Sequence, residues 1–166
     1  MRLASTFAIL ALVFAATCLA EPPASGKHSG PNAETIIGVR GSGLEKLQQF
    51  GTPELVLAKR GKTPADDDVL FRYNNFILRV HQDTIKTCFI ISEWKGTVRG
   101  IKMGDSREAV VKVLGKPRMV FKNKEGVETD YGYDLKDVDA TLYANFDEEG
   151  KLKRVEIGAG EKAESK

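Results

Sequence analysis

Eight short segments rich in apolar residues lie between residues 54 and 157, and several of them, such as 69–73, 76–80 and 140–146, place core-type residues at alternate positions. Alternation with a period of two is typical of strands whose sheet has one buried face. The strands predicted on this basis span residues 54–59, 69–73, 76–80, 87–92, 118–122, 129–134, 140–146 and 152–157. Short turns at 81–84 and 147–150 connect neighbouring strands, and Gly150 in the second turn suits a positive φ. We therefore expect antiparallel pairing.

A helix is predicted ahead of the first four strands. Ser42 and Glu45 form a capping box, in which the serine hydroxyl accepts from a free backbone N–H and the carboxylate reaches back. Leu44, Leu47 and Phe50 then share one face of the helix.

A second helix is predicted ahead of the last four strands, with a similar cap at 105–108. Its apolar stripe is formed by Ala109, Val110, Val113 and Leu114. Both helices are followed by the sequence Gly-x-Pro, in which glycine suits a left-handed C-cap and proline prevents continuation. We therefore expect each helix to end there.

The chain carries a weak internal duplication. A shift of 64 residues aligns three pairs near the helices: Ile37 with Ile101, Gly51 with Gly115 and Pro53 with Pro117. We therefore predict an α+β fold of two tandem helix-plus-antiparallel-sheet repeats, 36–92 and 98–158, with a connector at 93–97. Trp94 in the connector is expected to pack between the repeats or over a sheet edge.

Residues 1–20 have the features of a cleavable signal peptide. Arg2 supplies a positive charge, residues 3–17 carry none, and Cys18 and Ala20 place small residues at −3 and −1 of a cut before Glu21. The apolar run is shorter than the roughly 20 residues that a membrane-spanning helix needs. Lipid attachment at Cys18 is an alternative, although the residues before it match a lipoprotein signal poorly.

Two segments are expected to lie outside the folded part. Residues 21–35 are rich in proline, glycine and small polar residues, which predicts a disordered linker. A disordered tail is expected at 159–166, so order should extend from about Ile36 to the last predicted strand.

The charge balance argues against several classes of partner. The chain holds 25 Lys and Arg against 23 Asp and Glu, a net charge of +2. Removal of residues 1–20 takes away Arg2, which leaves 24 against 23 and a net charge of +1. So weak a field does not attract nucleic acid or an anionic membrane surface. Cys88 is the one cysteine beyond residue 20, which excludes an intramolecular disulfide.

The segment from Gly100 to Pro117 has the pattern GI-x-x-G-x-(S/T)-x-x-x-V-x-x-x-(L/F)-G-x-P. It resembles the opening of domains related to β-lactamase inhibitor protein and of outer-membrane assembly lipoproteins of the SmpA/OmlA type. The first copy departs from this pattern, because Arg40-Gly41-Ser42 replaces Gly-Asp-Ser. The resemblance extends over two copies from Ile36 to Ile157.

This resemblance implies that the two sheets join into one curved sheet with helices on one face. Similar proteins act in the bacterial cell envelope or outside the cell, bind other proteins and need no cofactor. The resemblance therefore implies an extracytoplasmic protein with another protein as its partner.

Few residues form a pattern with catalytic or metal-binding chemistry. Cys88 and His81 flank a turn, so a thiol-dependent enzyme with a Cys–His pair is an alternative. We expect Phe89 to face the core, which would place Cys88 on the opposite face of the sheet. The acidic run at 66–68 lacks the spacing of a calcium loop. Because zinc-ligand spacing and a phosphate-binding glycine loop are also missing from the sequence, no metal or cofactor is expected.

A candidate partner surface follows from the alternation. If Phe76, Leu78 and Val80 face the helices, the residues between them face away. The predicted partner-binding residues on this outer face are Arg72, Ile77, Arg79 and Tyr143. Tyrosine and arginine are enriched where partner binding is strongest. A solvated face without a partner is the alternative, and the basic stretch at 151–154 is expected on the same face or at a protected edge.

The sequence as a whole favours an exported, non-catalytic protein-binding module, either an inhibitor or an envelope assembly protein. A structural lipoprotein anchored through Cys18 and a thiol enzyme that uses Cys88 are the alternatives.

Overall fold

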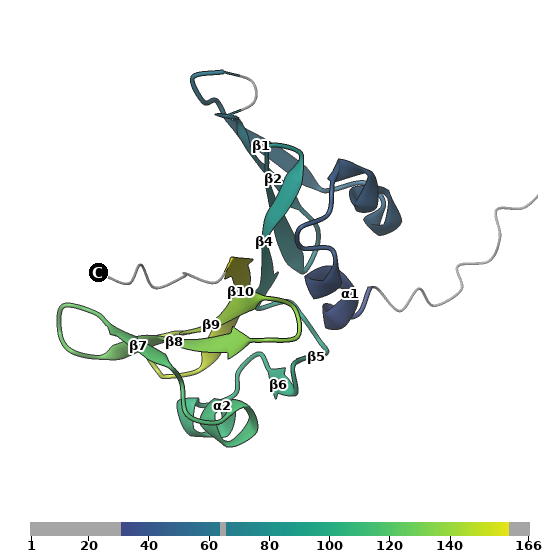
Figure 1. Cartoon of the computed structure of the whole chain (residues 1–166). Helices are drawn as coiled ribbons and strands as arrows, with labels where there is room; N and C mark the ends of the chain where they lie inside the picture. Colours follow the sequence, from purple (N-terminus) through teal and green to yellow (C-terminus); the bar gives the residue numbers. More distant parts are fainter. Residues whose placement is uncertain (1–30, 64–65, 160–166) are drawn as a thin grey trace, which may run out of the picture.

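The computed structural model describes residues 31–63 and 66–159 (Figure 1). The predicted signal peptide, Cys18, most of the predicted linker and nearly all of the predicted tail lie outside these residues. Eight strands form one antiparallel sheet in the order β1-β2-β3-β4-β10-β9-β8-β7. Their bounds are β1 Leu55–Lys59, β2 Asp68–Arg72, β3 Phe76–His81, β4 Thr84–Ile91, β7 Met119–Lys122, β8 Glu128–Leu135, β9 Ala140–Phe146 and β10 Leu152–Ala159.

All eight predicted strands are confirmed, with ends that differ by at most three residues. The predicted turns are also present, and Gly150 has the expected positive φ of 75°. A two-stranded hairpin of β5 Thr97–Val98 and β6 Ile101–Lys102 was not predicted, because two-residue strands leave no alternation to detect. Its turn places both Arg99 and Gly100 at positive φ.

Three short helices accompany the sheet: α1 Ala33–Gly38, the 3-10 helix η1 Leu44–Phe50, and α2 Arg107–Leu114. The first of these begins inside the predicted 21–35 linker, which is therefore too long at its C-terminal end. Asn32 caps α1, because its side chain accepts from the backbone N–H of Thr35 at 2.7 Å.

The prediction was more accurate for the second of the two predicted helices than for the first. The first is a 3-10 helix whose N-cap is Gly43 without a side-chain cap, so the capping box of Ser42 and Glu45 is wrong. The second is capped as predicted, since the Ser106 hydroxyl accepts from the N–H of Ala109 at 3.3 Å. Its predicted stripe is only partly correct, because Val113 is 49% exposed.

The predicted α+β class with two helix-plus-sheet repeats is wrong. Of the residues that the structure describes, strands hold 46% and helices only 17%. The six-residue α1 and the eight-residue α2 are too short to form a helical layer over a separate sheet of their own. Strands β4 and β10 also pair directly, so residues 36–92 and 98–158 contribute to one continuous sheet.

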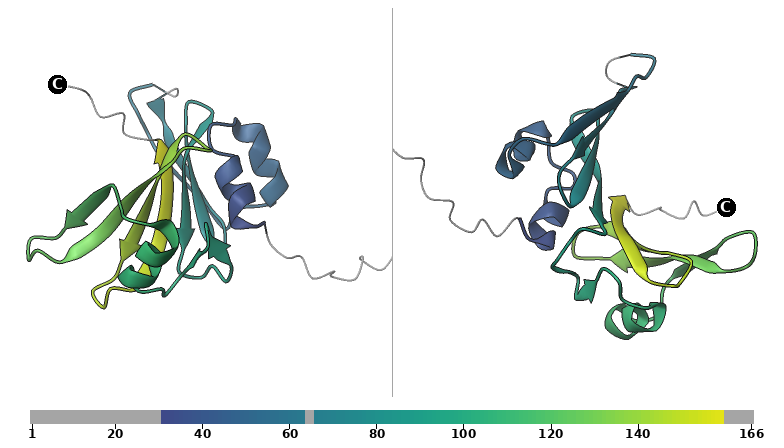
Figure 2. Two further views of the ribbon diagram at one scale, coloured as in Figure 1. Left: turned by 60° about the horizontal axis from the view of Figure 1, so that its bottom comes forward. Right: turned by 180° about the vertical axis from the view of Figure 1, so that it is seen from behind.

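The sheet is bent where β4 meets β10, so that the β1–β4 part and the β10–β7 part lie at an angle (Figure 1). All helices lie on the outer side of this bend, as the two further views also show (Figure 2). Within residues 31–63 and 66–159, the inner side of the bend carries no helix. We call it the open face, and the opposite side the covered face.

The core lies between the covered face and the helices. Leu78, Cys88, Ile90, Leu142 and Ile157 from the central strands are fully buried there. Their neighbours along each strand, such as Ile77 and Tyr143, are only half-buried on the open face. This difference fixes which side chains remain accessible to a partner.

Two arginines tie α1 and its neighbours to the loop between β8 and β9. Arg40 donates to the backbone carbonyls of Val138 and Asp139. Arg99 lies 2.6 Å from Asp137 Oδ2 and 3.4 Å from Glu34 Oε2. These contacts connect the two parts of the sheet on the helical side of the bend.

Candidate functional site

One row of directly paired residues crosses the open face from one edge strand to the other. The paired residues along it, from β1 to β7, are Leu55, Arg72, Ile77, Phe89, Glu156, Tyr143, Gly132 and Met119. We call this set the cross-sheet row. Directly paired residues in an antiparallel sheet point to the same face, so these side chains form one contiguous strip.

The structure places three of the four predicted partner-binding residues in this row: Arg72, Ile77 and Tyr143. The fourth, Arg79, lies two residues along β3 on the same face. Its guanidinium donates to both carboxylate oxygens of Asp68, at 3.2 and 2.8 Å. This pairing holds the pKa of Asp68 below its ordinary value. Arg79 is therefore partly neutralised within its own face.

A hollow of about 540 Å³ lies on the open face over β7–β10. It is lined by Phe121, Lys122, Thr129, Asp130, Tyr143, Asn145, Arg154 and Glu156. Arg154 organises this region, because its Nε donates to Asn145 Oδ1 at 2.5 Å and its guanidinium lies 5.7 Å from the centre of the Phe89 ring. The Phe121 and Tyr143 rings, 6.1 Å apart, form the other wall.

Glu156 is a half-buried carboxylate at the centre of the cross-sheet row. Burial raises the pKa of Glu156, and Asp130 adds to this effect, while Arg154 and Arg79 oppose it. The Arg154 Nη2 atom is 4.0 Å from Glu156 Oε2, which is a weak contact for an ion pair. The folded chain therefore holds an incompletely compensated negative charge in the middle of this face.

Glu156→Gln is expected to stabilise the fold at pH 7 by about 0.5–1 kcal/mol, typical of a partly exposed charge. Because the folded-state pKa is raised, the native state binds more protons than the unfolded state between the ordinary value of 4.5 and the raised value. The penalty is thus complete above this window and vanishes below it. Urea denaturation at pH 7 and pH 3.5 measures the difference, and an equal gain at both pH values would contradict this explanation.

Cys88 lies on the covered face, so its predicted position on the opposite face is wrong. It is fully buried, and its thiol donates to the carbonyl of Ile36 in α1 at 3.2 Å. Phe89, predicted to face the core, lies on the open face instead. Strand β4 is apolar on both sides, so alternation alone could not distinguish the two faces.

Burial raises the pKa of the Cys88 thiol to about 12. His81 lies on the other face, where its Nδ1 is 3.4 Å from Asp68 Oδ1. The Cys–His pair considered from the sequence is therefore not assembled, and the thiol is a small apolar core group.

Cys88 is expected to resist alkylation by iodoacetamide at pH 8 in the native protein and to react fully in 6 M guanidinium chloride, a concentration typical of complete unfolding. Mass spectrometry of the two samples measures the modified fraction. Rapid labelling of the native chain would show that the thiol is accessible, contrary to its position under α1.

The acidic run after residue 65 is bonded to its own surroundings. Asp67 accepts from the N–H of Gly61 at 2.8 Å, and Asp66 accepts from the hydroxyl of Thr63 at 2.9 Å. Among the described residues, no group of three or more His, Cys, Asp or Glu side chains is arranged to hold a metal ion.

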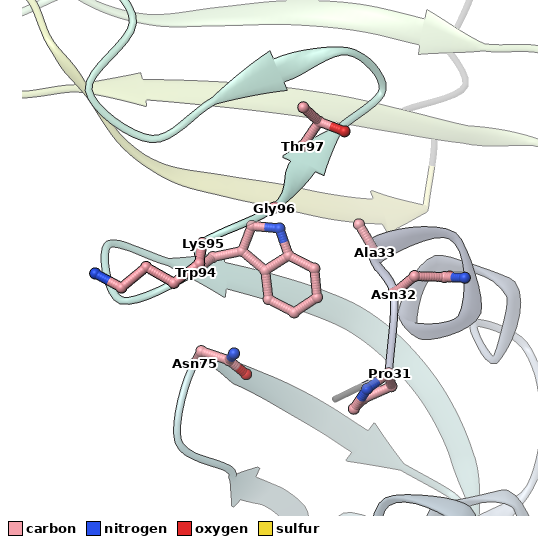
Figure 3. Close-up of a pocket in the computed structure, with 8 residues that line it drawn as sticks. All are labelled: Pro31, Asn32, Ala33, Asn75, Trp94, Lys95, Gly96 and Thr97. Atoms are coloured by element: carbon pink, nitrogen blue, oxygen red, sulfur yellow. The ribbon is translucent and has the colours of Figure 1, made fainter. Parts of the chain in front are cut away.

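A second hollow, of about 410 Å³, lies where the chain leaves β4 and where α1 begins (Figure 3). The Trp94 indole fills the space between Asn75 and the start of α1, and Lys95 points away from it (Figure 3). Trp94 is only 8% exposed, so it is buried at this junction between Asn75 and the start of α1. One charged residue, Lys95, lines this hollow, whereas four charged residues line the hollow on the open face. The open face is therefore the better candidate site.

Sequence reasoning missed much of the open face on β4, β7, β8 and β10. The missed residues are Phe89, Phe121, Asp130 and Glu156. The predicted basic stretch contains Arg154, which faces outward as expected, but β10 is a central strand and not an edge. Pairing of β10 with β4 brings these residues together, and this long-range contact leaves no local signal in the sequence.

No family model matches this chain, and no curated protein matches it either. Solved structures that share its fold include the following three. An extracellular protein containing an SCP domain from Bacillus anthracis str. Ames has a TM-score of 0.58 at 13% identity, over 82% of this chain and 49% of that one. A cysteine-rich secretory protein from Staphylococcus aureus subsp. aureus Mu50 has a TM-score of 0.53 at 16% identity, over 75% and 44%.

The third is a DUF4309 family protein from Bacillus subtilis subsp. subtilis str. 168, with a TM-score of 0.51 at 20% identity, over 76% of this chain and 92% of that one. This chain thus spans about half the length of the first two proteins. Identities this low establish a shared fold only. The resemblance to β-lactamase inhibitor protein and SmpA/OmlA domains stays a prediction.

Proposed function

We propose that this chain is an exported, non-catalytic module that binds another protein through its open face, as an inhibitor or an envelope assembly factor. The observation that carries the proposal is the cross-sheet row. It places arginine, aromatic and aliphatic side chains next to one another on the side of the sheet that faces away from the described helices.

The size and composition of the open face favour a protein over a small ligand. Seven strand spacings of about 4.8 Å give the row a length of roughly 34 Å, enough for an interface of standard size. Tyr143, Phe89 and Arg72 are of the residue types enriched at interface centres. The charges are mixed, since Arg154 and Arg79 lie among Glu156, Asp130 and Asp68. A partner with a protruding, partly apolar surface and both charge signs would fit.

The unfavourable position of Glu156 supports a functional role for this face. Natural proteins often keep a destabilising group where activity requires it. A basic residue of a partner could neutralise the Glu156 carboxylate, which Arg154 contacts only weakly at 4.0 Å.

Site-specific photo-crosslinking tests the proposal. A photoreactive phenylalanine analogue replaces Ile77 at the centre of the open face, or, as a matched control, Val113 on the exposed side of α2. We expect an extract of the source cell envelope and medium to give a discrete crosslinked protein with the Ile77 variant and none with the Val113 variant. Crosslinks from Val113 alone, or from neither position, would contradict binding at the open face.

Export is supported by the sequence of residues 1–20 and by the two fold relatives that are described as extracellular and secretory proteins. Among the described residues, no helix is long and apolar enough to cross a membrane. We expect the full-length chain, expressed in its source organism, to be recovered outside the cytoplasm with Glu21 as its first residue. Intact-mass measurement checks this, and a lipid-modified N-terminus at Cys18 would instead indicate an anchored lipoprotein.

A further inference from the structure

The two edges of the main sheet differ in how well they are protected. At one edge, β7 has a register shift between Phe121 and Lys122. At the other edge, β1 pairs regularly with β2 along all its five residues, and all five are exposed. A regular exposed edge strand is a template for pairing with another strand, and bulges or inward charges normally prevent this.

The exposed part of β1 is strongly apolar. Leu55, Val56 and Leu57 are 43%, 50% and 52% exposed, and they are among the most exposed large apolar residues of the described chain. Val56 lies directly opposite the half-buried Phe71 on the covered face, while Leu55 and Leu57 lie on the open face. Apolar surface is therefore available on both sides of the edge strand.

We propose that β1 pairs antiparallel with β1 of a second copy of this chain, with Leu57 on the two-fold axis. Leu57 then lies opposite Leu57, Val56 opposite Ala58, and Leu55 opposite Lys59, whose aliphatic stem covers the leucine. Continuing the register one residue places Glu54 opposite Arg60 at both ends of the contact.

Charge complementarity selects this register. A two-fold axis at Val56 would place Glu54 opposite Ala58 and Pro53, which has no N–H, opposite Lys59. An axis at Ala58 would place Val56 opposite Arg60. An axis at Ala58 would also bring Glu54 opposite Lys62, but Lys62 lies in the bend beyond β1. Within residues 54–60, only the axis at Leu57 forms two acid–base pairs and brings no like charges together.

Pairing of this kind joins two eight-stranded sheets into one continuous sheet, with both open faces on the same side. The contact is short, since five residues from each copy form it. Interfaces below about 1,200 Å² are generally weak and transient. We therefore expect association that depends on protein concentration.

Cysteine crosslinking tests the pairing and its register together. Leu57→Cys in the processed chain should form a disulfide-linked dimer under mild oxidation, because residue 57 lies opposite itself. Val56→Cys and Ala58→Cys should each dimerise at least tenfold more slowly alone, but should crosslink with each other when mixed. Cys88 does not interfere, since it is fully buried. Val113→Cys on α2 measures the rate of random collision.

Sedimentation equilibrium gives an independent readout that does not need cysteine. The average mass of the unmodified chain should rise towards that of a dimer with increasing concentration, and Leu57→Lys should abolish the rise without loss of β structure. The proposal is overturned if the unmodified chain stays monomeric up to ~1 mM, a limit typical of the weakest specific contacts. It is also overturned if Leu57→Lys still associates, or if Leu57→Cys crosslinks no faster than Val113→Cys.

Discussion

Ile157→Ala is expected to lower the free energy of unfolding by about 2–5 kcal/mol, the usual result of removing a large buried aliphatic group. Ile157 lies in the middle of the sheet on the covered face and is fully buried. It is paired with Cys88 of β4 on one side and with Leu142 of β9 on the other. Its removal leaves a cavity where the two parts of the sheet join, and β pairing on both sides restricts collapse into it.

The β4–β10 junction, where Ile157 lies, also determines how cooperatively the chain unfolds. Because β4 and β10 belong to one sheet, the chain should unfold in a single transition, and Trp94 fluorescence and far-ultraviolet circular dichroism should give the same urea midpoint. Val113→Ala is the control, since this half-exposed residue on α2 should change stability by no more than about 0.5 kcal/mol. Two separate transitions, or equal losses in both variants, would contradict a shared core at the β4–β10 junction.

Tyr143→Ala and Arg72→Ala are each expected to weaken binding of the crosslinked partner by about 30-fold or more, which corresponds to the ~2 kcal/mol typical of a dominant interface residue. The two residues occupy the same cross-sheet row on opposite sides of the bend. A partner seated within the bend would contact both of them, so the losses should appear together. Isothermal titration calorimetry with the purified partner measures them.

Lys112→Ala and Val113→Ala on α2 are the matched controls for a lost cation and a lost apolar side chain. Both should bind within about twofold of the unmodified chain, as expected for residues outside an interface. Circular dichroism at the assay temperature establishes that Tyr143→Ala remains folded. If Tyr143→Ala and Arg72→Ala also bind within twofold, the partner does not use the cross-sheet row.

Most of the strands were predictable from local signals, either alternation or a short apolar run bounded by turn residues. Ala140–Phe146 was located at its observed bounds, and the hairpin glycine Gly150 was correctly assigned. The faces of β3 and β9 were also correct, so Ile77 and Tyr143 lie on the side without helices. Period-two alternation carries this information within a few residues.

The remaining features depend on contacts that are distant in the sequence. Strand β4 is apolar on both faces, so only its pairing with β3 and β10 shows that Cys88 lies inside and Phe89 outside. Helix α1 was assigned to a linker because a proline- and glycine-rich stretch precedes it. The Asn32 cap was a local signal that could have located the helix. The two-repeat prediction failed because it gave each half a helical layer, whereas the described helices are only six to eight residues long.

The arginine contacts on the helical side affect how easily the angle between the two parts of the sheet can change. The bond from Arg40 to Asp139 and the ion pairs of Arg99 with Asp137 and Glu34 lie on the outer side of the β4–β10 junction. A partner that brings the β1–β4 part and the β10–β7 part closer together on the inner side must lengthen these contacts on the outer side. Salt weakens the ionic contact of the exposed Asp137 carboxylate and so softens the joint. Added salt should therefore change the affinity of this protein for a partner bound within the bend, even where that partner contacts only uncharged side chains.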